Sequence, residues 1–390
     1  MHVKGFWPSL AAAAFLAGCG GAPPAAAPSS AAGAPGTAKP AASASAAAAA
    51  ASNWADIVAG AKKEGQVTVL SQGGNAIADG LTAGFKQQYP DVKIDFTGAT
   101  GAEIATKLLT ERQAGKFTVD VIVHGTTTFI TSLMPANALD PLQPALVGPN
   151  DGDPKQWRDG YDYADDAGKY DLIFTGGVKV PLIYNPTLMK PSDVTSYKDL
   201  LDPKWKGKIA MIDPRLAGAG LASATFWYVT PGLGKDFLQK FFTQQQVMLT
   251  TDDRQLTDWV AQGKYAIGLA AQDFSALDLK QRGVPIELLP AEAVKEGTYL
   301  TAAWGSTGIV NKAPHPDAAR VYLDWLLSKS GQEDVAKASG YPSRRLDTSN
   351  AGLRDSVIPK PGVNYQDNSK EQFVKLKDEI INYLKPIIPS

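Results

Sequence analysis

The chain has 390 residues, a formal net charge of −1, three histidines and one cysteine. This length is enough for two domains or lobes, and the near-neutral charge argues against nucleic-acid binding. One cysteine excludes a disulfide framework or a cysteine-rich metal site, and the widely spaced histidines exclude a His-x-x-His metal helix.

The first residues have the pattern of an export signal. Lys4 supplies a positive start, and residues 6–17 form a mostly apolar segment too short to span a membrane as a helix. Leu16-Ala17-Gly18-Cys19 resembles the bacterial lipobox, in which cleavage precedes an acylated cysteine. We expect a lipoprotein signal peptide over 1–18 and lipidation at Cys19. The folded part would then lie outside the cytoplasmic membrane, in the periplasm or at the cell surface.

A segment rich in Ala, Pro and Ser follows over 19–52 and has few large apolar side chains to bury. We expect a lipid-anchored disordered tether, which a helical alanine run at 46–51 would shorten. The globular part is predicted to open with a helix that Asn53 caps and Gly65 ends.

Strands and helices then alternate, which predicts an α/β fold with a mostly parallel sheet. The expected strands are 67–71, 92–96 and 119–123, with helices marked by residues 77–85 and 104–114. Residues 135–175 show no clean period and are interpreted as covering loops.

Polar residues follow the three expected strands. In open sheets of this class, ligands bind beyond the carboxyl ends of the strands. The candidate ligand-binding residues at these ends are Gly74, Asn75, Thr100, Gly101, His124, Thr126 and Thr127.

The centre of the chain predicts a strand over 208–213, a small-residue turn over 214–220 and a helix from about 221. Gly218 and Gly220 allow a tight turn, and the N–H groups of the helix start suit an anion, with Arg215 as a forked donor. The turn nearly matches the dinucleotide fingerprint, but it lacks the acidic residue after a second strand. A structural turn without a ligand is the other alternative.

A second α/β unit is predicted over about 190–298. Thr251, Asp252 and Gln272 end two of its strands and add polar candidates for the site. Trp304 either stacks on the ligand or packs the hinge. A final amphipathic helix is expected over 371–384.

Several short motifs together resemble a known family, the extracellular solute-binding proteins of ABC importers, in the branch that includes ferric-iron binders. The resemblance covers about 54–345. Its marks are Thr100-Gly101-Ala102-Glu103, Glu111-Arg112-Gln113-Ala114-Gly115-Lys116, Leu139-Asp140-Pro141-Leu142, Tyr184-Asn185-Pro186, Trp205-Lys206-Gly207-Lys208 and Gly340-Tyr341-Pro342.

The resemblance implies a two-lobed fold of the type II periplasmic-binding-protein class. Each lobe is a mostly parallel sheet flanked by helices, and hinge crossovers join the lobes. We assign 53–185 and 299–390 to lobe 1 and 186–298 to lobe 2. A small-molecule solute would bind between the lobes of a monomer and pass to the membrane subunits of the importer.

The family's iron binders use adjacent tyrosines, and this chain has Gln272-Asp273-Phe274-Ser275 at that place. We therefore expect no metal site and no cofactor, with an organic anion or polar metabolite as the solute. A ferric-iron receptor is the alternative within the class. A secreted enzyme or a sensory protein is the alternative from another class, but no G-x-S-x-G elbow or supported triad is present, and we expect no enzyme.

Overall fold

The computed structural model describes residues 41–151 and 153–388. The chain divides into a segment of residues 1–46 and a unit of residues 47–390. The predicted signal peptide and the predicted lipidation site, Cys19, lie outside the described residues. The first described helix, α1, covers Ala41–Glu64 and therefore begins before the predicted cap at Asn53. Alanine has the highest helix propensity, which explains why the last residues of the predicted tether are helical.

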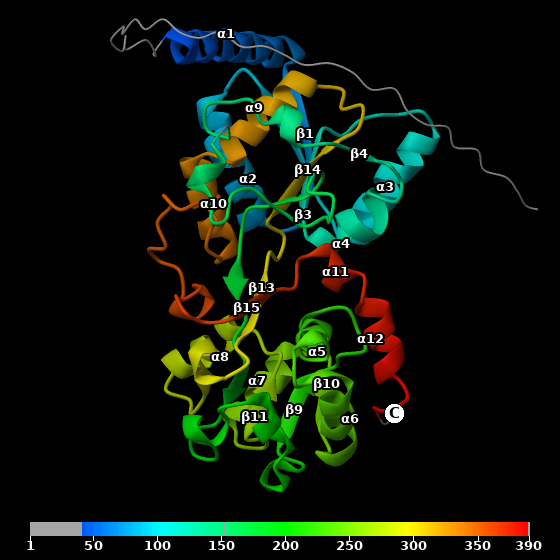
Figure 1. The fold of residues 1–390 in the computed structure, drawn as a ribbon, viewed down its shortest axis with the longest axis vertical. Helices are drawn as coiled ribbons and strands as arrows, with labels where there is room; N and C mark the ends of the chain where they lie inside the picture. Colours follow the sequence, from blue (N-terminus) through cyan, green and yellow to red (C-terminus); the bar gives the residue numbers. More distant parts are fainter. Residues whose placement is uncertain (1–40, 152, 389–390) are drawn as a thin grey trace, which may run out of the picture. The chain divides into compact units, whose positions relative to one another are not determined.

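The first lobe is built on a seven-stranded sheet (Figure 1). Its strand order is β2-β1-β3-β14-β6-β5, and β4 pairs with β14. The strands are β1 (Gln66–Ser71), β2 (Lys93–Gly98), β3 (Val121–His124), β4 (Leu139–Asp140), β5 (Asp162–Tyr163), β6 (Leu172–Ile173) and β14 (Ser306–Val310). Three of these, β4, β5 and β6, lie in the stretch interpreted as covering loops. Each has only two residues, which is too short to show a period of two.

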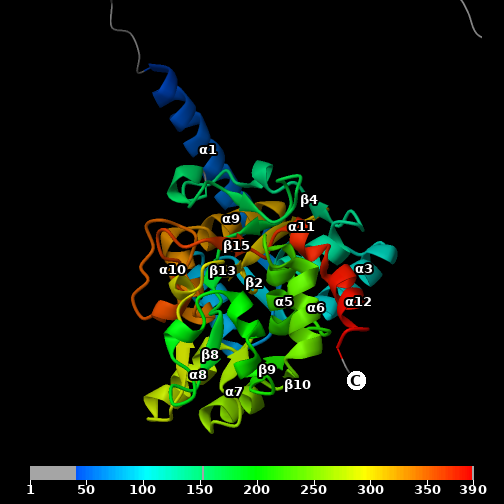
Figure 2. The ribbon, with the colours of Figure 1, turned by 60° about the horizontal axis from the view of Figure 1, so that its bottom comes forward.

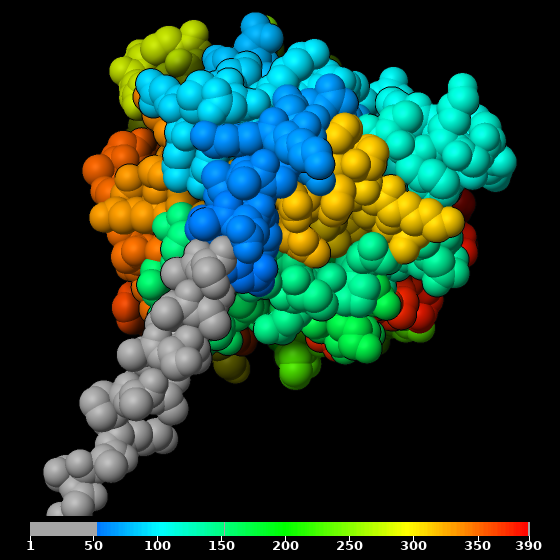
Figure 3. Space-filling model, turned by 90° about the horizontal axis from the view of Figure 1, so that it is seen from above, coloured from blue at the N-terminus to red at the C-terminus, as the bar shows by residue number. Residues whose placement is uncertain are grey.

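Helices cover both faces of this sheet. They are α2 (Asn75–Gln88), α3 (Gly101–Gln113), α4 (Thr126–Thr128), α9 (Pro316–Leu326) and α10 (Lys329–Ser339). The C-terminal half of α1 lies against the segment that opens α9 (Figure 3), where Ala318 N donates to Glu64 Oε2 at 2.8 Å. Apolar side chains such as Phe85, Tyr322 and Trp325 fill the core between α2, α9 and α10.

The second lobe has a five-stranded sheet of order β10-β9-β11-β8-β12. The strands are β8 (Leu182–Tyr184), β9 (Ile209–Ile212), β10 (Met248–Thr250), β11 (Ile267–Leu269) and β12 (Glu287–Leu289). The helices are α5 (Ala219–Val229), α6 (Gly234–Gln244), α7 (Asp253–Ala261) and α8 (Asp273–Gln281).

The parallel pairs in both sheets are those linked through a helix. They are β1 with β2 and β3, and β9 with β10 and β11. Strands that return from another part of the chain, β14 and β8, pair antiparallel with their neighbours. The expected parallel arrangement is therefore found in only part of each sheet, the strands β2-β1-β3 and β10-β9-β11.

A three-stranded sheet of order β15-β13-β7 lies between the lobes in Figure 1. Its strands are β7 (Gly177–Val178), β13 (Thr298–Thr301) and β15 (Tyr365–Asp367), so three separate passes of the chain meet there. The mostly apolar residues 178–184 therefore divide between β7 and β8.

The expected final helix is two helices, α11 (Glu371–Val374) and α12 (Lys377–Leu384). Helix α11 contacts α4 of the first lobe, and α12 contacts α5. Figure 2 shows α12 on the same side of the second lobe as α5 and α6. Ile380 and Leu384 join the apolar core of the second lobe, a contact that the assignment of 299–390 to lobe 1 did not anticipate.

Candidate functional site

A cavity of about 540 Å³ lies where the loops of both lobes meet the three-stranded sheet. We call it the central cavity. Its volume is within the range of small-molecule sites in proteins. It is lined by Gly125, Thr126, Thr127, Lys179, Ala217, Gly218, Ala219, Leu221, Ala222, Thr225, Gln272, Tyr299, Thr301, Ala303, Tyr341, Asn368, Ser369 and Lys377.

Lys179 brings a buried positive charge to this cavity from the crossover between β7 and β8. Its side chain is only 8% exposed, and its Nζ donates to Gln272 Oε1 at 2.7 Å. Burial alone would lower the pKa of Lys179, but the nearby Tyr341, Tyr299 and Asp273 raise it above its ordinary value. Lys179 is therefore a cation that donates a hydrogen bond to a neutral amide.

Two tyrosines stand beside this lysine. Tyr299 belongs to β13, is 4% exposed, and has its hydroxyl 3.3 Å from Ser223 Oγ. Burial raises the pKa of Tyr299, so its phenol keeps its proton and is able to donate a hydrogen bond. Tyr341 packs its ring directly against Gly177, where a Cβ would lie 1.8 Å from Tyr341 Cδ1. A side chain at Gly177 would displace this ring.

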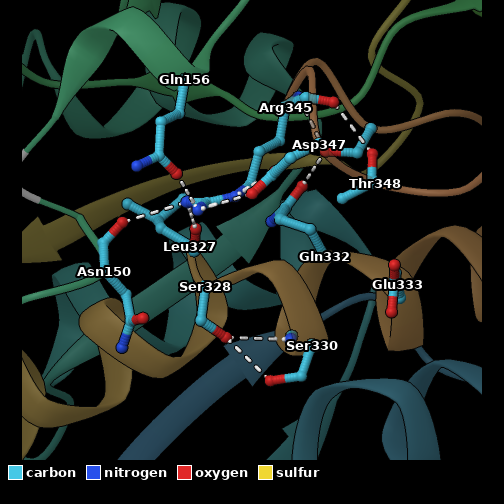
Figure 4. A network of polar contacts seen from close by, with 12 residues as sticks. Asn150, Gln156, Leu327, Ser328, Ser330, Gln332, Glu333, Arg345, Asp347 and Thr348 are labelled. Carbon is cyan, nitrogen blue, oxygen red and sulfur yellow. Dashed lines mark hydrogen bonds and ion pairs between the residues drawn. The ribbon is translucent and has the colours of Figure 1, made fainter.

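The turn that carries Tyr341 is fixed by the arginine four residues later. Arg345 donates from Nη1 to Leu327 O at 2.9 Å and to Asn150 O at 3.0 Å, and it pairs with Asp347 at 2.7 Å (Figure 4). These contacts tie the turn to the first lobe and hold the ring of Tyr341 at the cavity wall.

The C-terminal segment contributes the remaining polar groups. Asn368 Nδ2 donates to Ala222 O of α5 at 2.8 Å, and Ser369 Oγ accepts from Ala302 N at 2.8 Å. Lys377, at the start of α12, donates from Nζ to Thr127 Oγ1 at 2.8 Å. Burial lowers the pKa of Lys377. Two lysines therefore enter the cavity, and within the described part of the chain no Asp or Glu lines it.

The start of α5 adds a partial positive charge. Gly218 is its N-cap with φ of 145°, a conformation that favours glycine, and no side chain caps the helix. The first N–H groups of α5 are thus available to a ligand. Four of the predicted site residues lie in this cavity: Thr126, Thr127, Gly218 and Gln272.

Three other predicted residues line a neighbouring cavity of about 480 Å³. Thr100, Gly101 and His124 meet there with Gln72 and Gly73, because β1, β2 and β3 are adjacent parallel strands. Gly101 is required by close packing, since a Cβ would lie 2.1 Å from Thr128 Oγ1.

His124 lies where the two cavities adjoin, because His124 lines the smaller cavity and the next residue, Gly125, lines the central one. Its Nδ1 lies 3.1 Å from Thr128 Oγ1, and burial lowers its pKa. His124 Nε2 has no partner among the described residues, and it is a neutral polar group at neutral pH.

The other predicted residues have contacts that explain them without a ligand. Arg215 forms a forked ion pair with Asp213, with Nη2 2.7 Å from Oδ2, and it is not part of the cavity lining. Asp252 caps α7 by accepting from Arg254 N at 2.8 Å, and Thr251 precedes it on the surface.

Trp304 is 5% exposed and packs in the apolar core of the first lobe, and it does not line the central cavity. Gly220 lets α5 approach β9, since a Cβ would lie 2.3 Å from Ile212 O. Gly74 and Asn75 begin α2 beside the smaller cavity without lining it.

Sequence reasoning missed Lys179, Tyr299, Tyr341 and Lys377. Lys179 interrupts an apolar run, Val178 to Tyr184, and a lysine inside a buried run is the one signal that pointed to it. Lys377 looks like a surface residue of an amphipathic helix. Its position at the cavity follows from the packing of α12 on α5.

The described residues hold no group of three or more His, Cys, Asp or Glu side chains arranged to bind a metal ion. Over the same residues, no helix has the length and apolar character to cross a membrane.

Comparison with known proteins connects this geometry to a family. A sequence profile described as bacterial extracellular solute-binding protein matches residues 68–333. An uncharacterised protein of Haemophilus influenzae is 35% identical over 144 residues. That match covers 35% of this chain and 38% of the relative, so it spans well under half of the relative's length.

Two solved structures have the same fold. A Trichodesmium protein in complex with iron and citrate is 17% identical with a TM-score of 0.63, covering 83% of this chain and 99% of that one. The periplasmic binding protein AfuA of Actinobacillus pleuropneumoniae, with fructose-6-phosphate bound, is 20% identical with a TM-score of 0.58, covering 83% and 98%. Likeness at these identities establishes the two-lobed fold.

Proposed function

The chain belongs to the bacterial extracellular solute-binding proteins, and from this premise we propose that it captures a small organic anion in the central cavity for an ABC importer. The observation that carries the proposal is the charge of the lining. It contains Lys179, Lys377 and the start of α5, and the described residues contribute no carboxylate to it.

Anion capture follows from the cost of burying charge. A buried ammonium with a neutral partner has lost most of its hydration, and an anion restores that interaction. The α5 N–H groups and the hydroxyls of Tyr299 and Thr301 add neutral donors for the same ligand.

Capture would be coupled to the arrangement of the lobes. The lining combines residues of the first lobe, such as Thr127, with residues of the second, such as Gln272. A solute that contacts both sets binds the closed form more tightly and shifts the population towards it. The membrane subunits of the importer would then recognise the closed form.

Ferric iron is the alternative solute, since the Trichodesmium relative is described with iron and citrate. Tyr299 and Tyr341 line the central cavity and are hard oxygen donors in principle. A ferric ion bound there would lie beside the Lys179 ammonium, which opposes a metal cation. The sugar phosphate of the Actinobacillus relative is an anion and suits the same charges better.

The location of the protein is part of the proposal. Export by residues 1–18 and acylation of Cys19 would anchor it on the outer side of the cytoplasmic membrane. The predicted lobe bounds and the monomeric state belong to the same proposal.

A thermal-shift screen of the full chain in detergent tests this function. The panel contains carboxylates, phosphate monoesters, neutral sugars, polyamines and Fe(III). A ligand present at 100 times its Kd stabilises by about 2.7 kcal/mol, which shifts Tm by about 3–5 °C. We expect shifts of this size with anions alone. An Fe(III)-dependent shift with a tyrosinate colour would favour the iron receptor, and turnover of a panel member would favour an enzyme.

A further inference from the structure

Resting on the proposed function, we propose that the solute is a dianion with its two negative groups held apart, one at Lys179 and the other at Lys377. The short carbon skeleton between the groups would lie along the apolar part of the lining.

Buried and half-buried cations elsewhere in the described residues have carboxylate partners. Arg344 pairs with Asp162 and Asp367, and Lys370 also pairs with Asp162. Pairing of this kind offsets the loss of hydration that a buried charge suffers. The charges of these cations are thus neutralised by acids of the chain itself.

Lys179 does not follow this pattern. Its Nζ donates to the neutral Gln272 Oε1 at 2.7 Å. Asp273, the acid whose charge raises the pKa of Lys179, accepts from Arg354 Nε at 2.7 Å and from Ser356 Oγ at 2.8 Å. That carboxylate is already satisfied, so the charge of Lys179 is left for a group that enters the cavity.

Lys377 is the second cation of the cavity lining, and it forms no ion pair with an acid among the described residues. Its Nζ donates to the hydroxyl of Thr127 at 2.8 Å. The packing of Ile380 and Leu384 in the second-lobe core fixes α12, so this lysine at its first turn stays at the cavity.

The two ammonium groups are held at different walls. Gln272 follows β11 of the second-lobe sheet, whereas Thr127 follows β3 of the first-lobe sheet. The lining also includes the apolar side chains of Ala219, Leu221 and Ala222, and the cavity of about 540 Å³ is far larger than one inorganic anion. A ligand with an anionic group at each end of a short chain matches this arrangement.

The test is isothermal titration of the full chain in detergent with α,ω-dicarboxylates from malonate to adipate. The best binder is compared with its monomethyl ester, which removes one charge and keeps the skeleton. The variants are Lys179→Met, Lys377→Met and the control Lys240→Met. Lys240 is a lysine of α6 that pairs with Asp236 at 2.8 Å and does not line the cavity.

We expect the ester to bind about 30-fold or more weakly, and each cavity variant to weaken the dicarboxylate by a similar factor. The ester should be insensitive to one of the two cavity substitutions, because one lysine has lost its partner. Lys240→Met should bind like the wild type. Melting of each variant without ligand establishes that it is folded.

Other results would overturn the inference. One is equal affinity for the diacid and its ester, and another is a Lys377→Met variant that binds like Lys240→Met. Tighter binding of glycerol 3-phosphate than of every dicarboxylate would place both charges on one group. In these cases anions still bind, and the proposed function stands. If neutral solutes bind and no anion does, both proposals fail.

Discussion

Replacing Asp151 with asparagine should abolish much of the loss of folding stability that the chain undergoes as the pH rises from about 5 to about 8. Asp151 is fully buried, and its Oδ1 accepts from Gly148 N at 2.8 Å. Its Oδ2 has no partner among the described residues. Burial and the nearby Asp324 carboxylate raise the pKa of Asp151 from 3.8 to about 7.

The sign of the effect follows from the raised pKa. In the unfolded chain Asp151 loses its proton near its ordinary pKa, whereas in the folded chain it keeps the proton until about pH 7. Its contribution to folding is therefore greatest at low pH and is lost as the pH rises towards 7. A shift of this size corresponds to about 4 kcal/mol in total, of which about 2–3 kcal/mol falls above pH 5.

The assay is urea unfolding followed by tryptophan fluorescence at several pH values. Asparagine keeps the acceptor for Gly148 N and does not titrate. Asp151→Asn should thus match the wild type near pH 5 and be about 2 kcal/mol more stable near pH 8. The matched control is Asp278→Asn, whose carboxylate is 67% exposed in a surface pair with Arg282. Parallel pH profiles for the wild type and Asp151→Asn would refute the reasoning.

Three further predictions concern residues that the sequence singled out. Gly220→Ala places a methyl 2.3 Å from Ile212 O and should destabilise folding by about 1–3 kcal/mol in urea unfolding, and an unchanged midpoint would show that α5 shifts freely. Arg215→Ala should leave anion affinity in titration calorimetry within about threefold of wild type, because Arg215 is paired with Asp213 outside the cavity; a tenfold loss would contradict this. Cys19→Ser should move the protein from the membrane to the soluble fraction at unchanged anion affinity, and a variant still bound to membranes would argue against the anchor.

The alternation of strands and helices was enough to predict the fold class. It also predicted that the loops after β1, β2 and β3 meet, because parallel neighbours place their carboxyl ends together. Between the lobes, Thr126 and Thr127 of the first lobe line the same cavity as Gly218 of the second lobe.

The sequence pattern alone could not predict that β14 and β8 pair antiparallel with their neighbours. The sequence pattern of a strand is the same whether the strand pairs parallel or antiparallel with its neighbour. Both β14 and β8 also pair with strands that are distant in the sequence. The two-residue strands β4, β5 and β6 are defined by their neighbours and have no local signal of their own.

The candidate site shows the same limit. Arg215 and Asp252 have the chemistry of ligand-binding residues, but each is used locally, by Asp213 and by the start of α7. Lys179 and Lys377 carry the charge of the cavity, and their positions there depend on the crossover and on the packing of α12. Tertiary burial, which no local pattern records, decides which charged residues are left for a solute.

The most direct test of the central claim is mass spectrometry of the small molecules released when the full chain, purified without added ligand, is denatured. The wild type and Lys179→Met are compared at equal protein amounts. The account predicts an organic anion that is enriched in the wild type over the variant. Release of a neutral solute or of ferric iron, or the same anion in equal amounts from both proteins, would contradict it.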